Sequence, residues 1–452
     1  MAKIKLTRIE FGDADASKQF AALRQKLSLQ ADVISPKSRA LTEKVFGEAL
    51  TPSQVVERVC KDVRTQGAKA VLHYTEQFDR KKLTPDTLRV ADAELAAAHK
   101  AADPEFLATI RRIRSNIMAF QMGLVHTDAI MQTPGKSELR MRYRPMRRVG
   151  ICVPGGAAAY PSTLLMTVCP ARAAGVKEIV VVMPPTPNGS ENPDQLAVCR
   201  ELGVDEVYRM GGAQAVAALA YGIEDVPGVD MIVGPGNLFV TLAKKYVYGQ
   251  VAIDCLAGPS EIVVLADETA SPDFIASDLL AQAEHDPASA VLITWHEPLL
   301  DAVEEALERQ LKTLERGEQA RNCLEQFGAL VLARDAVQAV TWTNDIGPEH
   351  LHIITKNPEK FGERIDNAGA VFLGPHTPVA LGDYAAGPSH VLPTGGTARF
   401  TSGLSAVDFQ RRSSWISFTP RGLQRIAPDV QTLARKEGLT AHAASVEIRV
   451  GE

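Results

Sequence analysis

Cysteine is scarce in this sequence, with six among 452 residues and no C-x-x-C pair. Scattered thiols are typical of a reducing compartment rather than of a disulfide framework. The chain also lacks any apolar run near the roughly 18 to 20 residues of a membrane span. Residues 1–13 carry charges in place of the apolar segment of a secretory signal. We therefore expect a cytoplasmic protein with no membrane partner.

An excess of positive charge is also missing, since 49 basic residues stand against 54 acidic residues, for a net charge of −5. A nucleic-acid partner would require a basic face that displaces phosphate counterions, so we expect none. One basic segment stands out, and it consists of Arg140, Arg142, Arg144, Arg147 and Arg148. It is either an anion site or nucleic-acid strip, or an exposed strand whose alternate residues face water beside a domain junction. The second interpretation is favoured because the rest of the chain shows no basic surface.

The pattern of apolar residues changes along the chain. It has helical spacing in 53–66 and 104–120, and Pro134-Gly135 then interrupts it. Strands are predicted after that point at 149–153, 178–183, 206–210, 231–233, 262–266, 290–295, 329–333, 351–355 and 370–373. Helices are predicted between these strands, and this alternation indicates parallel sheets with helices on both faces.

We therefore expect an α/β protein with two tandem, doubly wound, incomplete Rossmann-like domains, a helical N-terminal region and a small C-terminal tail. The predicted units are an N-terminal arm (1–30), a first α/β domain with a helical lead-in (31–140 plus 259–400), a second, nucleotide-binding α/β domain (141–258) and a tail (401–452). The tail is predicted to contain short helices and to be too small to fold alone.

Glycines cluster at the predicted strand ends, at 155–156, 211–212 and 234–236. Ligands of doubly wound sheets gather at the carboxyl ends of strands, over helix N-termini. The G-x-G-x-x-G dinucleotide fingerprint is absent, and Gly234-Pro235-Gly236 is its nearest relative. These features favour an enzyme that acts on a nucleotide or another small ligand.

Two pairs of polar residues could carry chemistry. Gln282 and His285 lie three apart at the end of a predicted helix and share one face, so they could bind one ion, although a capping or buried histidine is the commoner outcome. Glu349 and His350 precede a predicted strand and could act as a paired acid and base. The alternative for this second pair is a surface loop.

Two further segments combine acids with histidines. The segment 381–390 holds Asp383 and His390 between glycines, in the kind of loop where binding residues concentrate, although a turn with a capping Asp is equally compatible. Near the end of the chain, Glu437 and His442 lie five residues apart. Seven of the ten histidines fall between His285 and His442, which supports a metal or acid–base centre.

Eight ordered segments resemble the histidinol dehydrogenase family, and the likeness covers about 50–449. They are VGICVPGGAAAYPS (149–162), GGAQAVAALAY (211–221), VDMIVGPGNLFV (229–240), AGPSEIVVLAD (257–267), DLLAQAEH (278–285), GPEHL (347–351), GDYAAGPSHVLPT (382–394) and EGLTAH (437–442). The resemblance implies an oxidoreductase that converts L-histidinol to L-histidine through L-histidinaldehyde, in two hydride transfers to NAD. It also implies one zinc ion per subunit.

The resemblance assigns roles to individual residues. The implied zinc ligands are Gln282, His285, Asp383 and His442, a set that suits a zinc ion open to substrate. His350 is implied as the base that removes the alcohol proton, and Glu349 as the group that activates water for attack on the aldehyde.

The remaining implied contacts concern the substrate, the cofactor and a second subunit. Substrate contacts fall on the zinc ligands and His350, and further on Ser260, His390 and Glu437. Dinucleotide contacts fall on Gln214 and Asn237, with Cys152 beside the cofactor. The tail is implied to complete the site of a neighbouring subunit in an intertwined homodimer.

The sequence departs from the family pattern at two places. Cys152 stands where a tyrosine is common, which puts the packing of the dinucleotide in doubt, and Ser389 replaces a usual asparagine beside His390. Three alternatives stay open: a relative that oxidises another small alcohol such as sulfopropanediol, an aldehyde dehydrogenase that uses Cys152 or Cys255 as nucleophile, and a non-catalytic binding protein. The cysteine alternative requires a basic neighbour or a helix N-terminus at the thiol.

Overall fold

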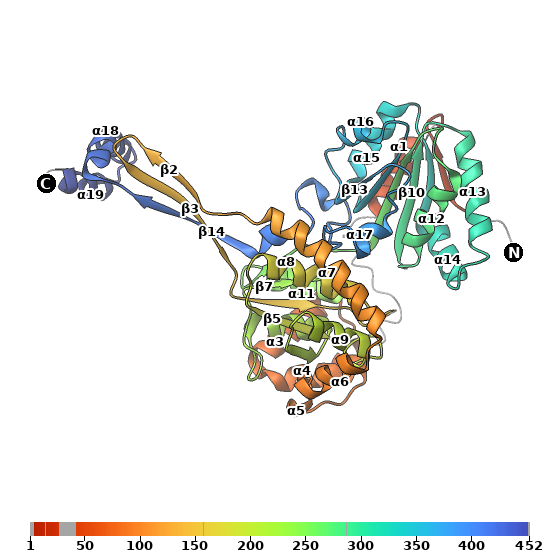
Figure 1. Ribbon diagram of the computed structural model, residues 1–452, viewed down its shortest axis with the longest axis horizontal. Coiled ribbons are helices and arrows are strands. Elements are labelled where there is room, and N and C mark those ends of the chain that lie inside the picture. The colour runs from red at the N-terminus through yellow and green to blue at the C-terminus, as the bar shows by residue number, and fades with distance from the viewer. Residues whose placement is uncertain (1–3, 14, 27–41, 157, 286, 451–452) are drawn as a thin grey trace.

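The computed structural model describes residues 4–13, 15–26, 42–156, 158–285 and 287–450. Two parallel sheets with helices on their faces form the body, and an antiparallel ribbon carries the C-terminal helices away from it (Figure 1). The predicted α/β fold class is confirmed. No helix in these described ranges is both long and apolar enough to cross a bilayer.

The first sheet has six parallel strands in the order β1-β11-β10-β9-β12-β13. The strands are β1 (Thr7–Glu10), β9 (Ser260–Ala266), β10 (Ala288–Thr294), β11 (Gly328–Leu332), β12 (His350–Ile354) and β13 (Ala370–Leu373). The helices between them are α12 (Pro272–Ala283), α13 (Pro298–Gln310), α14 (Gly317–Phe327), α15 (Ala336–Ile346) and α16 (Pro358–Gly362). From central β9 the chain winds outward to β11 and then returns to β12 on the other side, as a doubly wound sheet does.

The second sheet repeats this winding in the order β6-β5-β4-β7-β8, again with all strands parallel. Its strands are β4 (Arg148–Cys152), β5 (Glu178–Met183), β6 (Glu206–Arg209), β7 (Met231–Val233) and β8 (Ala252–Ile253). Its crossover helices are α8 (Pro161–Ala173), α9 (Pro193–Glu201), α10 (Gly212–Tyr221) and α11 (Leu238–Val247). Nearly continuous apolar runs such as Glu178–Met183 are buried on both faces, which explains why the sequence revealed them.

The N-terminal helices pack on the second sheet. They are α3 (Pro52–Gln66), α4 (Ala68–Asp79), α5 (Pro85–Leu88), α6 (Asp92–Ala101) and α7 (Pro104–Leu124). Val55, Val59 and Val63 share a core with residues of β5 and α10. The predicted grouping of 31–140 with 259–400 is therefore wrong for these helices, because periodicity identifies an apolar face but not the sheet that covers it. In the arm, β1 pairs with β11, and α1 (Ala16–Lys26) follows it.

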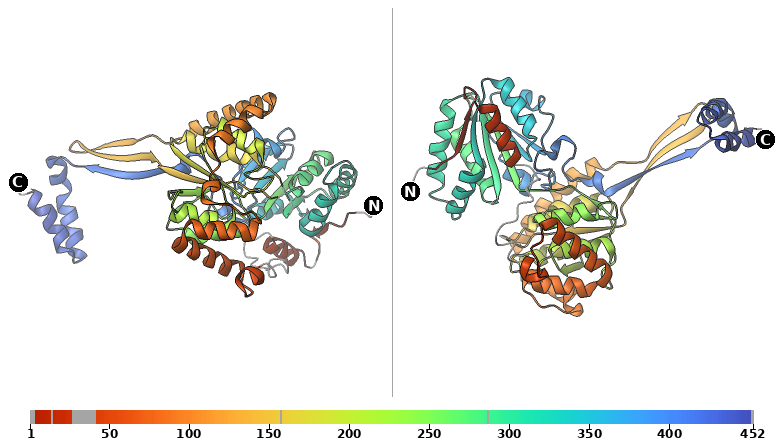
Figure 2. Two further views of the ribbon diagram at one scale, coloured as in Figure 1. Left: turned by 90° about the horizontal axis from the view of Figure 1, so that it is seen from below. Right: turned by 180° about the vertical axis from the view of Figure 1, so that it is seen from behind.

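The third sheet is antiparallel and joins β14 (Gln410–Ser417), β3 (Ser137–Pro145) and β2 (Ala129–Thr133). It extends from the body and ends at α18 (Pro420–Lys436) and α19 (Thr440–Val450), as all three views show (Figures 1 and 2). The interpretation of the arginine segment as a strand is thus confirmed for β3. The tail differs from the expected run of short helices, since it includes a long strand and the 17-residue α18.

Residues 254–259 connect the carboxyl end of β8 to the amino end of β9, and so join the two sheets. Hydrogen bonds bridge this junction, from Thr241 Oγ1 to Ala257 O at 2.7 Å and from Gly258 N to Thr394 Oγ1. The glycine loops of the second sheet lie at its carboxyl edge, as predicted. In the first sheet, by contrast, Ser260 and His350 are the first residues of β9 and β12, so they lie at the amino edge.

Candidate active site

Glu349 and His350 lie where neighbouring strands β9 and β12 begin. The Glu349 carboxylate accepts hydrogen bonds on Oε2 from Ser260 Oγ at 2.5 Å and from Glu261 N at 2.9 Å. Glu349 is only 7% exposed. Burial raises the pKa of Glu349 to about 7, against the lowering effect of these two hydrogen bonds. A carboxyl group with this pKa can take up or release a proton near neutral pH.

The His350 ring lies between two polar side chains. Its Nδ1 is 3.1 Å from Gln282 Oε1, and its Nε2 is 3.7 Å from Asp383 Oδ1. Burial lowers the pKa of His350, so the imidazole is neutral at physiological pH. The amide oxygen of Gln282 is an acceptor, which assigns the proton to Nδ1 and leaves a lone pair on Nε2.

Gln282 and His285 lie at the C-terminal end of α12. Gln282 is buried, and its Nε2 has no hydrogen-bond partner among the described residues. His285 follows the last helical turn, where its backbone N donates to Gln282 O at 3.1 Å. The His285 ring lies close enough to this pair to influence the pKa of both Glu349 and His350.

The segment that carries Asp383 and His390 reaches the same place from the other side. Asp383 lies in α17 (Ala380–Tyr384), and His390 Nδ1 is 3.0 Å from Asp383 O. Desolvation lowers the pKa of His390 to about 4, so its ring is neutral. Two contacts secure the loop on helices of the second sheet, from Gln121 Nε2 to Gly387 O and from Ser389 Oγ to Met166 O. Ser389, the predicted departure, therefore anchors the loop backbone.

The structure does not bring Glu437 and His442 to this cluster within one chain. Both residues lie at the far end of the ribbon, by α18 and α19, and are exposed (Figures 1 and 2). Among the described residues, no three His, Cys, Asp or Glu side chains converge as a metal site would require. One chain thus supplies at most part of the predicted zinc ligand set.

The predicted dinucleotide contacts lie at the carboxyl edge of the second sheet. Gln214 is in the first turn of α10, is 1% exposed, and its Oε1 has no partner in the described part of the chain. Asn237 caps α11, because its Oδ1 accepts from Phe239 N and Val240 N. Gly234 has φ +102°, and a Cβ there would lie 2.2 Å from Cys152 O, so only glycine fits.

The two cysteines considered as nucleophiles are buried. Burial raises the pKa of the Cys152 thiol to about 11 and that of Cys255 to about 12. Neither thiol ionises appreciably at neutral pH, although the thiolate is the reactive form. The structure therefore disfavours the cysteine-dependent alternative.

Four residues with buried polar contacts were missed by the sequence reasoning. They are Lys244, Asp254, Asp278 and His352. A signal existed for the second pair, since Asp278 lies one helical turn before Gln282 and His352 lies two strand positions after His350. Each therefore shares a face with a predicted site residue.

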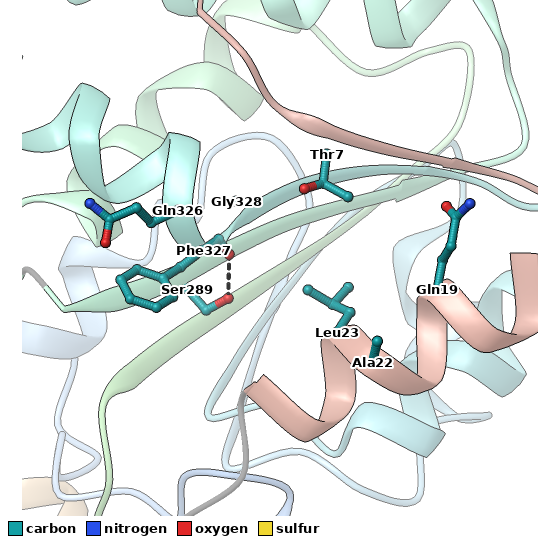
Figure 3. Close-up of a pocket in the computed structure, with 8 residues that line it drawn as sticks. All are labelled: Thr7, Gln19, Ala22, Leu23, Ser289, Gln326, Phe327 and Gly328. Carbon is teal, nitrogen blue, oxygen red and sulfur yellow. Dashed lines mark hydrogen bonds between the residues drawn. The ribbon is translucent and has the colours of Figure 1, made fainter. Parts of the chain in front are cut away.

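A separate pocket of about 210 Å³ lies at the amino edge of the first sheet, near β1 and β11. Figure 3 shows it between α1 and this edge, with Leu23 and Thr7 facing inward and Ser289 bonded to Phe327 O at 2.7 Å. Its lining is mostly apolar and contains none of the predicted site residues. We therefore take the Glu349–His350 cluster, and not this pocket, as the candidate active site.

Comparisons with known proteins show the family of this chain. The family model described as histidinol dehydrogenase matches residues 47–450. The chain is 60% identical over 437 residues to a histidinol dehydrogenase from Rhodopirellula baltica, covering 96% of this chain and 95% of that protein. It is 46% identical over 411 residues to one from Heliobacterium mobile, covering 91% and 96%.

A solved structure agrees as well. The crystal structure of histidinol dehydrogenase from Elizabethkingia anophelis superposes with a TM-score of 0.89 at 32% identity, covering 100% of this chain and 99% of that one. The likeness extends over both sheets and the tail. This chain belongs to the histidinol dehydrogenase family of oxidoreductases.

Proposed function

We propose that this chain catalyses the oxidation of L-histidinol to L-histidine through L-histidinaldehyde, with NAD as oxidant and one zinc ion per subunit. The observation that carries the proposal is the buried Glu349–His350 pair, which Ser260, Gln282 and Asp383 contact from separate segments of the chain. An acid–base pair enclosed by polar groups is the arrangement that a stepwise alcohol oxidation requires.

His350 acts as the base for the alcohol proton. Its Nδ1–H donates to Gln282 Oε1, so the lone pair on Nε2 points toward Asp383. Because burial lowers its pKa, the ring is ready to accept a proton at neutral pH without first losing one. Bound NAD would supply the acceptor for the hydride of the carbinol carbon.

Glu349 acts in the second half of the reaction. Among the described residues, the Glu349 carboxylate accepts two hydrogen bonds, and both are accepted by Oε2. They fix the group and leave Oε1 for a water molecule. With a pKa of about 7, the carboxylate can take a proton from that water as it attacks the aldehyde. The resulting hydrate presents a second hydride for transfer.

The chemistry of the donor set fits zinc. An amide, two imidazoles and a carboxylate from Gln282, His285, His442 and Asp383 are ligands that zinc accepts. The buried Oε1 of Gln282 accepts from His350 Nδ1 and keeps a second lone pair that could face the ion, so the amide need not turn. Zinc, when bound, supplies a Lewis acid for the substrate oxygen.

The position of His442 leads to the proposed homodimer. His442 lies at the end of the ribbon, apart from its own Asp383, so the fourth ligand comes from the tail of a second copy. The same tail carries Glu437, whose carboxylate would meet the substrate ammonium group. Neutral His390, beside Asp383, is placed to hydrogen-bond the substrate from this chain's own side.

The dinucleotide is assigned to the carboxyl edge of the second sheet. The unpaired Oε1 of Gln214 is a buried acceptor that a ribose hydroxyl or an amide N–H of the cofactor would satisfy. Asn237 uses Oδ1 for its cap, so its amide N–H groups face the ligand side. Cys152 is the last residue of β4, the central strand of the second sheet, and we assign it to the wall of this dinucleotide site.

The proposal is tested by adding L-histidinol and NAD to the purified protein, with and without a chelator. We expect two NADH per histidinol, lost on chelation and restored by zinc. One NADH per substrate, or indifference to the chelator, would contradict the scheme. Sulfopropanediol serves as the comparison substrate, and its preferential oxidation would favour a different alcohol.

A further inference from the structure

Helix α12 and strand β12 are joined by two parallel side-chain contacts. In one, Gln282 Oε1 meets His350 Nδ1 at 3.1 Å, and in the other, Asp278 Oδ2 meets His352 Nδ1 at 2.5 Å. Four helical residues advance about 6 Å and two strand residues about 6.6 Å, so the spacing of the two contacts matches on both elements. Only the Gln282–His350 contact belongs to the proposed chemistry.

Both ring nitrogens of His352 have hydrogen-bond partners. Its Nε2 lies 2.8 Å from Gly374 O, so both nitrogens face oxygen acceptors. His352 is 1% and Asp278 4% exposed. Two protons are shared in these two hydrogen bonds, and a flipped ring would direct carbon atoms at both oxygens. The ring is therefore held in one orientation.

A gain in stability does not explain why this buried polar pair is present. Leu279 follows Asp278 in α12, Val264 pairs with His352 in the register of β9 and β12, and both belong to the apolar core of the first sheet. A buried polar pair in such a place seldom adds more stability than apolar residues of similar size. What it does add is a fixed register, because a histidine and an aspartate bond only at one relative position of helix and strand.

We propose that Asp278 and His352 form a positioning pair that sets the register of α12 on β12, and thereby directs Gln282 at Nδ1 of His350. The inference depends on the proposed function for its catalytic consequence. The contact from Gln282 keeps the proton on Nδ1 of His350, so the reactive lone pair stays on Nε2. His285, at the end of the same helix, takes its position from the same register.

The test compares four variants of the full-length protein. Asp278→Leu leaves His352 Nδ1 without a partner, whereas Asp278→Leu/His352→Leu removes both polar groups together. Asp278→Asn keeps both contacts, because its amide N–H can donate to Nδ1 while Nε2–H donates to Gly374 O. Ser289→Ala is the matched control, since it removes a part-buried side-chain hydrogen bond of similar length from β10 of the same sheet (Figure 3).

We expect the double variant to unfold in urea at nearly the wild-type midpoint, yet to lose about 10- to 100-fold in kcat, as loss of a positioning partner typically does. Asp278→Asn should stay within about threefold of wild type. Ser289→Ala should change stability but not kcat. A double variant with wild-type stability and wild-type kcat would overturn the proposal.

A second readout does not require turnover. Nitrogen NMR of the metal-free protein with ¹⁵N-labelled histidine reports the tautomer of His350, assigned by the signal that His350→Gln removes. We expect one Nδ1–H tautomer in wild type and Asp278→Asn, and a mixture in the double variant. An unchanged tautomer in the double variant would refute the positioning role, whether or not the wild type oxidises histidinol.

Discussion

Lys244 and Asp254 form a buried ion pair that holds both backbone polar groups of one glycine. Lys244 Nζ lies 2.7 Å from Asp254 Oδ1 and also donates to Gly234 O, while Asp254 Oδ2 accepts from Gly234 N at 2.7 Å. Burial is the largest single effect and lowers the pKa of Lys244, but the charge and hydrogen bond of Asp254, together with the neighbouring Cys152 and Cys255, leave that pKa raised. The pair therefore fixes the loop from which α11 and Asn237 begin.

We predict that Lys244→Met destabilises the protein by about 3–5 kcal/mol, because it leaves the Asp254 carboxylate buried without its partner. Urea unfolding measures this loss. Lys244→Met/Asp254→Leu should recover most of the stability and still raise KM for NAD about tenfold or more, since the loop is released. An unchanged KM for NAD in the double variant would show that the loop does not contact the cofactor.

We predict that substitutions of Glu349 and His350 separate the two halves of the reaction. His350→Gln should lower kcat for histidinol about 10²- to 10⁴-fold with little change in KM, because it removes the base. Glu349→Gln should oxidise histidinaldehyde more slowly by a similar factor and retain more of the alcohol step. Stopped-flow measurement of the two NADH phases distinguishes the variants, and equal loss in both phases for Glu349→Gln would contradict its assignment.

We predict that two inactive variants complement each other if the tail completes a neighbouring site. His442→Ala lacks a ligand in its tail, and His350→Gln lacks the base in its body. Refolded as an equal mixture, half of the dimers are mixed and one of their two sites is intact, so about a quarter of wild-type activity should return. No recovery, with mixed dimers verified by mass spectrometry, would argue against a shared site.

We predict that Glu261 makes the fold less stable as pH rises. Glu261 is buried beside Glu349 and accepts from Gly395 N at 2.9 Å, and desolvation raises its pKa from the ordinary 4.5 to about 8. The folded state thus holds a proton that the unfolded chain has already lost above pH 4.5. Stability should fall by on the order of 1 kcal/mol per pH unit between about pH 5 and pH 8.

The matched variant for this prediction is Glu261→Gln, which keeps the acceptor and cannot ionise. Its stability relative to wild type should rise between about pH 5 and about pH 8, as measured by urea unfolding at each pH. Parallel curves for the two proteins would show that Glu261 does not hold the proton.

The strands that local pattern could identify are mainly those buried on both faces. Runs such as 178–183 and 231–233 are β5 and β7 with the predicted bounds, and the half-exposed β13 was identified because residues 370–373 are also all apolar. The edge strand β1 and the ribbon strands β2 and β14 were missed, because these half-exposed strands have no continuous apolar run. The sequence also could not predict which sheet the N-terminal helices cover, because an amphipathic face does not specify its partner.

The candidate site shows the same division. Residue types and spacing singled out Gln282 with His285 and Glu349 with His350, because helix and strand periodicity places each pair locally. The assignments of Ser260 and Gln214 came from the family resemblance and not from any local pattern. The partners Asp278 and His352 carried a spacing signal that was overlooked.

The sequence by itself determined the winding of the two sheets, the glycine turns and the local pairs of reactive residues, because each depends on backbone preferences and periodicity within a few residues. Only the tertiary structure decided that β9 and β12 lie side by side and that Glu349 and His350 lie at their amino edge. It also decided that these groups are buried beside Gln282 and Asp383, while His442 lies apart. Contacts between distant segments depend on how the layers pack, and packing also sets the burial that shifts the pKa values of Glu349 and His350.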